Sequence, residues 1–159
     1  MTIAHPHPTP DAPLPPPLAA SPAFLLSKVG ATALRLFASA LEPLGLRPRH
    51  YTVMASLATQ GAQSQQMLCD RLRIDGSGMV ALVDELEGRL LAERRRDPQD
   101  RRRYAVHITD KGRELLAEAE AASDDVQNRL LAPLRAEQRS QLHELLLAVA
   151  RVPRAATGG

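Results

Sequence analysis

Hydrophobic positions recur at spacings of three and four residues along most of the chain, which is the period of an amphipathic helix. The first such segment spans about residues 23–42, and its apolar positions are Phe24, Leu25, Val29, Leu36, Phe37, Ala40 and Leu41. Pro43 and Gly45 end it. The apolar stripe is wide for a helix on the surface of a small domain, so we expect this segment to pack against more than its own chain.

Three shorter helical segments follow. The first begins near Pro48, ends at Gly61 and carries Tyr51, Met54 and Leu57 on one face. Ser64 is a plausible N-cap for the second, whose apolar positions are Met67, Leu68 and Leu72. Asp75 caps the third, which runs to about Arg89 with Val80, Val83, Leu86 and Leu90 predicted on its inner side. A tight turn at residues 73–75 joins the last two segments, as in a helix-turn-helix.

After residue 91 the spacing of the hydrophobic residues changes from the helical period to the two-residue alternation of a strand. Residues 92–96 and 102–108 are predicted strands, and Asp97-Pro98-Gln99-Asp100 between them has the composition of a turn. This pattern predicts a hairpin with a charged tip directly after the helix-turn-helix.

Two further helices complete the pattern. Thr109 caps one that runs to about Leu131, Pro133 breaks it, and the last spans roughly residues 135–152. The predicted fold is mainly α with a small β-hairpin wing: a winged helix-turn-helix plus a helical dimerisation region. Because the apolar stripes of residues 24–41 and 115–149 exceed what one small lobe can cover, we predict a homodimer.

Composition divides the chain into one domain and two tails. Residues 1–22 hold eight of the 13 prolines, which indicates a disordered tail, and residues 153–159 form a second one. Residues 23–152 form the single domain, with a DNA-binding lobe at about 46–109 and dimerisation helices at about 23–42 and 110–152. The lone cysteine, Cys69, excludes an internal disulfide. No stretch of membrane-spanning length is free of charge and no secretory signal is present, so we expect a cytoplasmic protein without a membrane partner.

The distribution of charge along the chain indicates the kind of partner it binds. The net charge is only +2, but seven arginines and three acids fall between Arg89 and Arg103. A local basic stripe on a nearly neutral protein is typical of a phosphate-binding surface, although a solvated charged face explains charge runs equally well. No phosphate loop, metal cluster or nucleophile elbow is present, so we expect no catalytic residue, no metal and no cofactor.

A helix fits the major groove of DNA, and a basic hairpin reaches toward the adjacent minor groove. On a helical wheel the third short helix turns small, uncharged side chains outward in its first turns. The candidate DNA contacts outside the hairpin tip are Ser64, Gln65, Arg71, Arg73, Ser77, Gly78, Ala81 and Arg95.

The run LEGRLLAERRRDPQDRRRYAVHITDKG, residues 86–112, resembles the wing of the MarR family of regulators. The preceding helix-turn-helix is similar to the same family, and the resemblance covers about residues 25–150. It implies a dimer whose first and last two helices interlock beneath two DNA-binding lobes. In the wing it implies that Asp100 orients Arg102 into the minor groove, with Arg101 and Arg103 nearer the phosphates. The alternative is that Asp100 and Arg102 only stabilise the hairpin.

Three positions depart from the family pattern. Leu90 replaces a glycine that usually ends the recognition helix in a left-handed turn, so we expect the helix exit to differ. Ala81 stands where Arg or Thr is common, and Gly78 removes a side chain near the bases. Direct base contacts are therefore expected to be few.

The family also implies regulation by small molecules. Phe37, His50, Tyr51 and Met54 are candidates for a ligand pocket, although each is equally explained as a core or interface residue. The predicted function is a dimeric repressor that binds a pseudo-palindromic operator in double-stranded DNA and is released by a small aromatic or phenolic ligand. The alternative is a winged-helix protein-interaction module without specific DNA binding.

Overall fold

The computed structural model describes residues 14–96 and 104–150 of the chain. Its helices are α1 (Pro16–Ala19), α2 (Pro22–Leu41), the 3-10 turn η1 (Glu42–Leu44), α3 (Pro48–Gln60), α4 (Gln65–Leu72), α5 (Gly76–Gly88), α6 (Asp110–Leu130) and α7 (Ala136–Ala150). The strands β1 (Ala92–Arg96) and β2 (Tyr104–Ile108) form an antiparallel hairpin. The expected mainly helical fold with a hairpin wing is confirmed.

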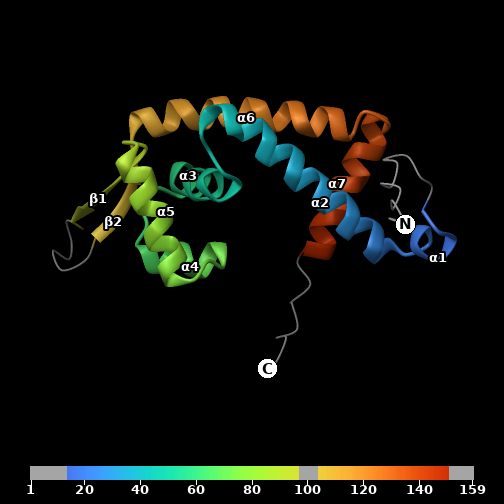
Figure 1. Ribbon diagram of the computed structural model, residues 1–159, viewed down its shortest axis with the longest axis horizontal. Coiled ribbons are helices and arrows are strands. Elements are labelled where there is room, and N and C mark those ends of the chain that lie inside the picture. Colours follow the sequence, from blue (N-terminus) through green and yellow to red (C-terminus); the bar gives the residue numbers. More distant parts are fainter. Residues whose placement is uncertain (1–13, 97–103, 151–159) are drawn as a thin grey trace, which may run out of the picture.

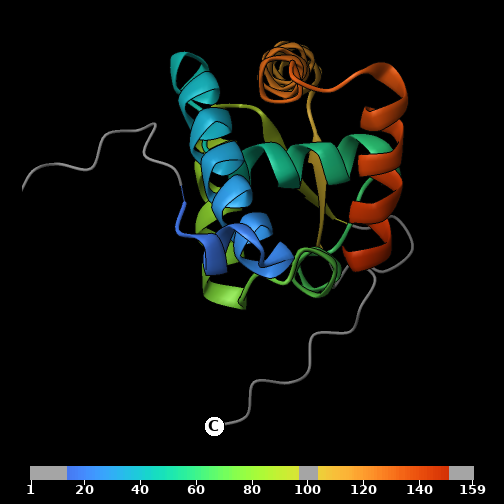
Figure 2. The ribbon, with the colours of Figure 1, turned by 90° about the vertical axis from the view of Figure 1, so that its right-hand side faces the viewer.

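The long helix α6 connects two parts of the molecule (Figure 1). At one end lie α3, α4, α5 and the hairpin, and at the other lie α7 and the first turns of α2. Viewed along α6, helices α2 and α7 stand on opposite sides of the molecule (Figure 2). The helix-turn-helix and the hairpin therefore form a lobe that projects to one side of α6.

Local capping signals set where the helices begin. The hydroxyl of Ser64 accepts a hydrogen bond from the amide of Met67, at 3.2 Å. The carboxylate of Asp75 and the hydroxyl of Thr109 accept in the same way from Gly78 and Gly112, at 2.8 and 3.0 Å. Each cap satisfies an amide that the helix leaves unpaired, so all three predicted starts are confirmed.

A single hydrophobic core lies inside the lobe. Its largest fully buried side chains are Leu41, Val53, Met54, Leu57, Leu68, Met79, Val83, Leu86, Leu91 and Val106. The prediction for the inner face of α5 is partly wrong. Val80 and Leu90 are 45% and 68% exposed, while Met79 and Leu82 are buried in their place. Because Val83 and Leu86 are buried as predicted, the hydrophobic stripe of α5 is rotated by less than one residue, and Leu90 lies beyond the end of the helix.

Leu90 follows α5 in the left-handed region, with φ of 61°. The expectation of a different helix exit is therefore wrong, because leucine keeps the left-handed turn that glycine would adopt freely. The Leu90 carbonyl accepts a hydrogen bond from the Thr109 hydroxyl at 2.7 Å, and the Arg89 carbonyl accepts one from the Lys111 ammonium at 3.0 Å. These contacts hold the turn in place.

The predicted N-terminal tail differs from the structure within residues 14–22. One turn of helix, α1, spans Pro16–Ala19, and α2 begins at Pro22 after its cap Ser21. Proline is compatible with the first turn of a helix, where its missing N–H has no partner to lose. Residues 1–13 and 151–159 and the predicted turn at 97–100 lie outside the described residues.

Gly112 lets α6 approach the end of α5. A Cβ atom at Gly112 would lie 2.1 Å from the Leu91 carbonyl oxygen and 2.8 Å from Ile108 Cγ1. We predict that Gly112→Ala lowers the free energy of unfolding by about 1–3 kcal/mol, since the backbone must move apart. Gly88→Ala is the control, because a Cβ there meets no atom within 4 Å. Equal denaturation midpoints for the two variants at one protein concentration would contradict this contact.

Candidate nucleic-acid interface

Helix α5 presents a small, uncharged surface at its start. Ser77 and Ala81 are exposed and Gly78 is half-buried, as the helical wheel predicts. The Ser77 hydroxyl donates a hydrogen bond to the Asp75 carboxylate at 2.6 Å. This hydrogen bond has the largest effect in lowering the pKa of Asp75, and the hydrogen bond from the Gly78 amide lowers it further. Ser77 thus takes part in the helix cap while remaining at the surface.

Arg94 on β1 joins the hairpin to the helix-turn-helix. Its guanidinium forms ion pairs with Asp84, at 2.7 Å, and with Glu87. Its Nε donates to the side-chain oxygen of Gln65 at 2.9 Å, and its amide donates to Glu87. One half-buried side chain therefore contacts both α4 and α5 from β1, so the hairpin and the helix-turn-helix are fixed to each other.

The carboxylate of Glu85 on α5 is held from the start of α3. Arg47 forms an ion pair with it, and His50 Nε2 lies 2.7 Å from the same oxygen. The Nδ1 atom of His50 accepts a hydrogen bond from the Arg47 amide at 3.1 Å, so the neutral ring carries its proton on Nε2 and donates to Glu85. Each acid in the second half of α5 therefore forms an ion pair with an arginine of another segment: Glu85 with Arg47, and Asp84 and Glu87 with Arg94.

Burial lowers the pKa of His50 and outweighs the hydrogen bond to Glu85, which raises it; the charge of Arg47 lowers it further. The hydrogen bonds from Arg47 and His50 lower the pKa of Glu85. His50 is thus a neutral hydrogen-bond donor to Glu85 and holds α5 against the start of α3.

The remaining candidate contacts are placed as follows. Arg71 and Arg73 are exposed, and Arg73 forms the left-handed turn between α4 and α5 with φ of 53°. Ser64 is half-buried and caps α4, and Gln65 is half-buried against Arg94. Arg95 is exposed but paired with Glu93. The candidates Asp100, Arg101, Arg102 and Arg103 lie outside the described residues.

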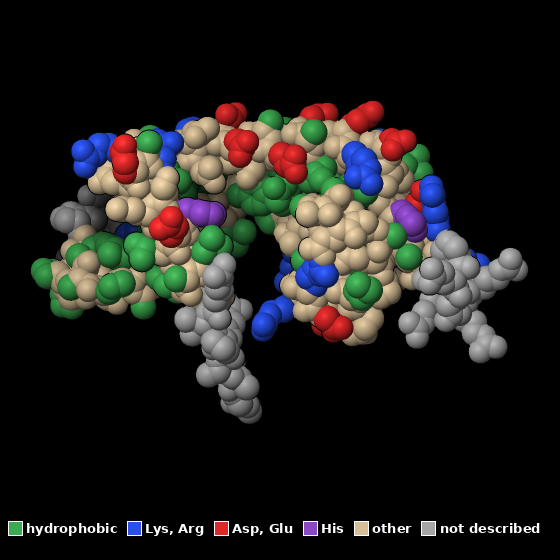
Figure 3. Space-filling model, turned by 180° about the vertical axis from the view of Figure 1, so that it is seen from behind, with side chains coloured by type: hydrophobic (Ala, Val, Ile, Leu, Met, Phe, Trp, Pro, Cys, Tyr) green, Lys and Arg blue, Asp and Glu red, His purple; other side chains and the backbone are tan. Residues whose placement is uncertain are grey.

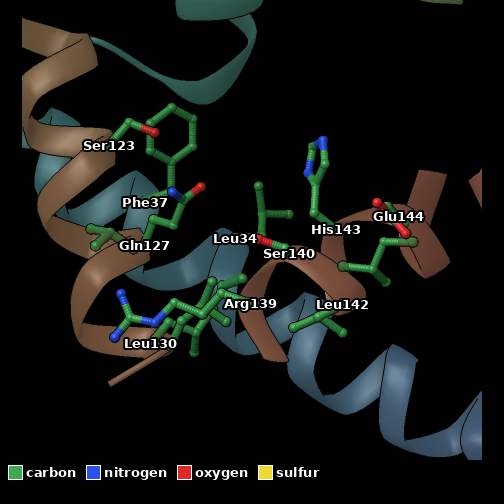
Figure 4. A pocket seen from close by; sticks show the side chains of 14 residues that line it. Leu34, Phe37, Ser123, Gln127, Leu130, Arg139, Ser140, Leu142, His143 and Glu144 are labelled. Atoms are coloured by element: carbon green, nitrogen blue, oxygen red, sulfur yellow. The ribbon is translucent and has the colours of Figure 1, made fainter. Parts of the chain in front are cut away.

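A cavity of about 880 Å³ lies between α2, α6 and α7 (Figure 4). Of the four predicted pocket residues, only Phe37 lines it. The ring of Phe37 meets Tyr51 edge to face, with 5.0 Å between the ring centroids. Met54 is fully buried in the core and His50 is buried against Glu85. Of the four candidate pocket residues, Phe37 and Tyr51 therefore contact each other, and only Phe37 lines the cavity.

Arg94, Arg47 and Glu85 are the positioning residues that the sequence interpretation missed. Strand alternation could have predicted that Arg94 faces the helices, because it lies on the same face of β1 as the buried Ala92. Acids at positions 84 and 87 of the neighbouring helix then supply its partners. Arg47 and Glu85 are 38 residues apart, and no local pattern pairs them.

Comparison with known proteins places this geometry in a family. Residues 44–103 match the model of the MarR family. A putative transcriptional regulatory protein for the hcr operon of Thauera aromatica is 34% identical over 100 residues, covering 62% of this chain and 60% of that protein. The matches span about half to three-fifths of the length of such curated relatives.

Solved structures are matched over nearly their whole length. A MarR-family transcriptional regulator from Rhodococcus sp. RHA1 is 33% identical with a TM-score of 0.73, covering 82% of this chain and 94% of that one. CouR from Rhodococcus jostii RHA1, bound to p-coumaroyl-CoA, is 34% identical with a TM-score of 0.74, over 87% and 97% of the chains. The repressor CouR bound to a 23-mer DNA duplex gives a TM-score of 0.79 at 30% identity, over 88% and 100%. The chain belongs to the MarR family of winged-helix transcriptional regulators.

The buried His50 predicts a pH dependence of stability. Because its pKa is lower in the folded chain than in the unfolded one, the unfolded chain binds more protons as the pH falls below about 6.5. Stability should therefore decrease from pH 7.5 to pH 5.5, with a slope from this group of at most about 1.4 kcal/mol per pH unit. Chemical denaturation at a series of pH values measures it.

The variant His50→Gln keeps a neutral donor and should flatten this slope. His143→Gln removes an exposed histidine of α7 and is the matched control. A slope that is unchanged in His50→Gln would show that another group titrates in this range.

Proposed function

We propose that the chain is a cytoplasmic DNA-binding repressor that acts as a homodimer, with α5 in the major groove and the hairpin in the adjacent minor groove. The observation that carries the proposal is the fixed pairing of recognition helix and wing through Arg94. The similarity to CouR bound to a DNA duplex, at a TM-score of 0.79, supports it. The operator is proposed to be pseudo-palindromic, because a two-fold dimer presents two equivalent recognition helices.

Charge is distributed in keeping with this orientation. Acidic side chains follow the outer edge of α6, and the described arginines of the hairpin and of α4 lie on the projecting lobe (Figure 3). The exposed acids of α6 are Asp110, Glu114, Glu118, Glu120, Asp124 and Asp125. Residues 46–96 carry eight arginines and six acids, whereas α6 carries six acids and only three cations, so a polyanion is favoured on the lobe over α6.

The proposed dimer is supported by apolar surface on α2 and α7. The exposed side chains outside the cavity between α2, α6 and α7 are Leu25, Leu26, Val29 and Leu36 on α2, and Leu145, Leu147 and Val149 on α7. The segment Pro22–Leu44 is long and apolar enough to cross a membrane, with only 6% of its most apolar window buried, although Lys28 and Arg35 interrupt it. Exposed apolar side chains on both helices are typical of an interface, and a second copy of the chain is the proposed partner.

The proposed effector is a small aromatic or phenolic molecule in the cavity between α2, α6 and α7. The cavity is open to solvent, and its volume of about 880 Å³ is enough for a ligand larger than a simple phenol. Phe37 lines the cavity and touches Tyr51 on α3, and the neighbouring His50 holds Glu85 on α5. A ligand that displaces Phe37 would therefore disturb the recognition helix. The structure of CouR with p-coumaroyl-CoA, a thioester that carries a phenol, supports this ligand class.

Selection of duplexes from a random pool with the purified protein tests the function. We predict that Ser77→Glu abolishes binding to the selected operator, because a carboxylate at the start of α5 repels the phosphates. A glutamate in the first turn of a helix is favourable, but this variant also loses the hydrogen bond from Ser77 to Asp75, so its denaturation midpoint is measured beside its affinity. Ala121→Glu adds the same charge on the exposed side of α6 and should bind like the unmodified chain.

Equal operator affinity of the Ser77→Glu and Ala121→Glu variants would remove α5 from the interface. Failure to enrich any sequence, together with binding that does not depend on salt, would favour a protein-interaction module. The same assay gives the stoichiometry, expected to be two chains per operator. Repeating it with p-coumaroyl-CoA as the probe tests the ligand class, and release of the DNA is the expected result.

A further inference from the structure

Arg96 and Tyr104 face each other at the last described pair of the hairpin. They are direct partners in the antiparallel register. The Nε–H of Arg96 donates to the phenol oxygen of Tyr104 at 3.3 Å, and the guanidinium carbon lies 5.8 Å from the centre of the Tyr104 ring. Tyr104 is 51% exposed, so this pair lies at the surface.

Strand alternation places Arg96 on the face of the hairpin that meets the helix-turn-helix. Side chains two residues apart point to the same side of a strand, so Arg96 shares the face of Arg94. Arg94 contacts both α4 and α5. Arg96 lies about 7 Å further along the strand, toward the tip of the hairpin and beyond those contacts.

The charges of the three neighbouring arginines are compensated differently. Arg94 pairs with Asp84 and Glu87. Arg95, on the opposite face, pairs with Glu93. Among residues 14–96 and 104–150 no carboxylate forms an ion pair with Arg96. Within this part of the chain Arg96 is the β1 arginine whose charge is left for an external anion.

We propose that Arg96 binds a backbone phosphate of duplex DNA beside the groove that α5 enters, and that Tyr104 is a positioning residue for it. The inference rests on the proposed DNA-binding function and identifies a contact of that surface. It transfers the role predicted for Arg95 to the next residue, because Arg95 faces away from α5 and is already paired.

Tyr104 has a physical role in this contact. A free arginine side chain loses considerable rotamer freedom when it binds a phosphate. The ring and the hydroxyl of Tyr104 restrict Arg96 before the DNA arrives, and the hydrogen bond uses only one of the five guanidinium N–H groups. The others remain available to a phosphate.

The salt dependence of binding to a random-sequence duplex tests the phosphate contact. Each phosphate contact contributes about 0.9 to the slope of log affinity against log salt concentration. Arg96→Ala should lower the slope by about 0.9 per chain and weaken binding at 0.1 M salt about eightfold per chain, or about 60-fold for a dimer that makes both contacts. Arg96→Gln, which removes the charge but keeps a donor for Tyr104, should lower the slope equally. Arg95→Ala is the matched control and should leave the slope unchanged.

The Tyr104 variants separate positioning from contact. Tyr104→Ala leaves the charge of Arg96 in place, so the slope should stay while the affinity falls about two- to fivefold at every salt concentration. Tyr104→Phe keeps the ring beneath the guanidinium and should recover most of the affinity. Thermal melting of each variant is measured in parallel. A loss of melting temperature in Tyr104→Ala with no loss of affinity would reduce the pair to a hairpin-stabilising contact.

The remaining outcomes are decisive as well. If Arg95→Ala lowers the slope and Arg96→Ala does not, Arg95 is the phosphate contact and the inference is overturned. If the unmodified chain binds no duplex at any salt concentration, the proposed function fails and this inference fails with it. If the unmodified chain binds duplex DNA and both Arg96 variants keep its salt slope, the Arg96 contact is refuted and the proposed function stands.

Discussion

The bridge made by Arg94 is the constraint on which the interface depends. A two-stranded hairpin is only marginally stable in water, and it must be held at a defined angle to α5 if both are to meet one duplex. Arg94 supplies that restraint through Asp84 and Glu87 on α5 and Gln65 on α4. Because the guanidinium is half-buried and multiply bonded, it is a stronger restraint than an exposed ion pair. The same contacts compensate two of the acids on the recognition helix.

Much of the fold was predictable because its signals are local. Ser64, Asp75 and Thr109 each bond an amide three residues ahead, so a short sequence window contains the whole interaction. The change from a helical to a two-residue period located the hairpin, and the apolar pattern located every long helix. The exposed residues Ser77 and Ala81 followed from the same helical period.

What the sequence did not reveal depends on contacts between distant segments. The family resemblance made His50 a candidate pocket residue, and it gave no sign that Glu85, 35 residues away, binds its ring. The rotation of α5 that buries Met79 and exposes Val80 is set by packing on α3 and the hairpin. Leu90 adopts a left-handed conformation that its own propensity opposes, because Thr109 and Lys111 bond the carbonyls on either side of it. In each case tertiary contacts override the local preference.

The central claim is that recognition helix and wing read DNA as one unit held by Arg94. Hydroxyl-radical footprinting of the selected operator, with the unmodified chain and with Arg94→Met, tests it most directly. Methionine has no guanidinium to bind Asp84, Glu87 or Gln65, while the backbone amide of residue 94 can still donate to Glu87. Arg94→Met is expected still to protect the backbone around the major groove read by α5 but to lose protection of the flanking minor groove. A flanking footprint of unchanged strength, at equal occupancy of the operator, would contradict it.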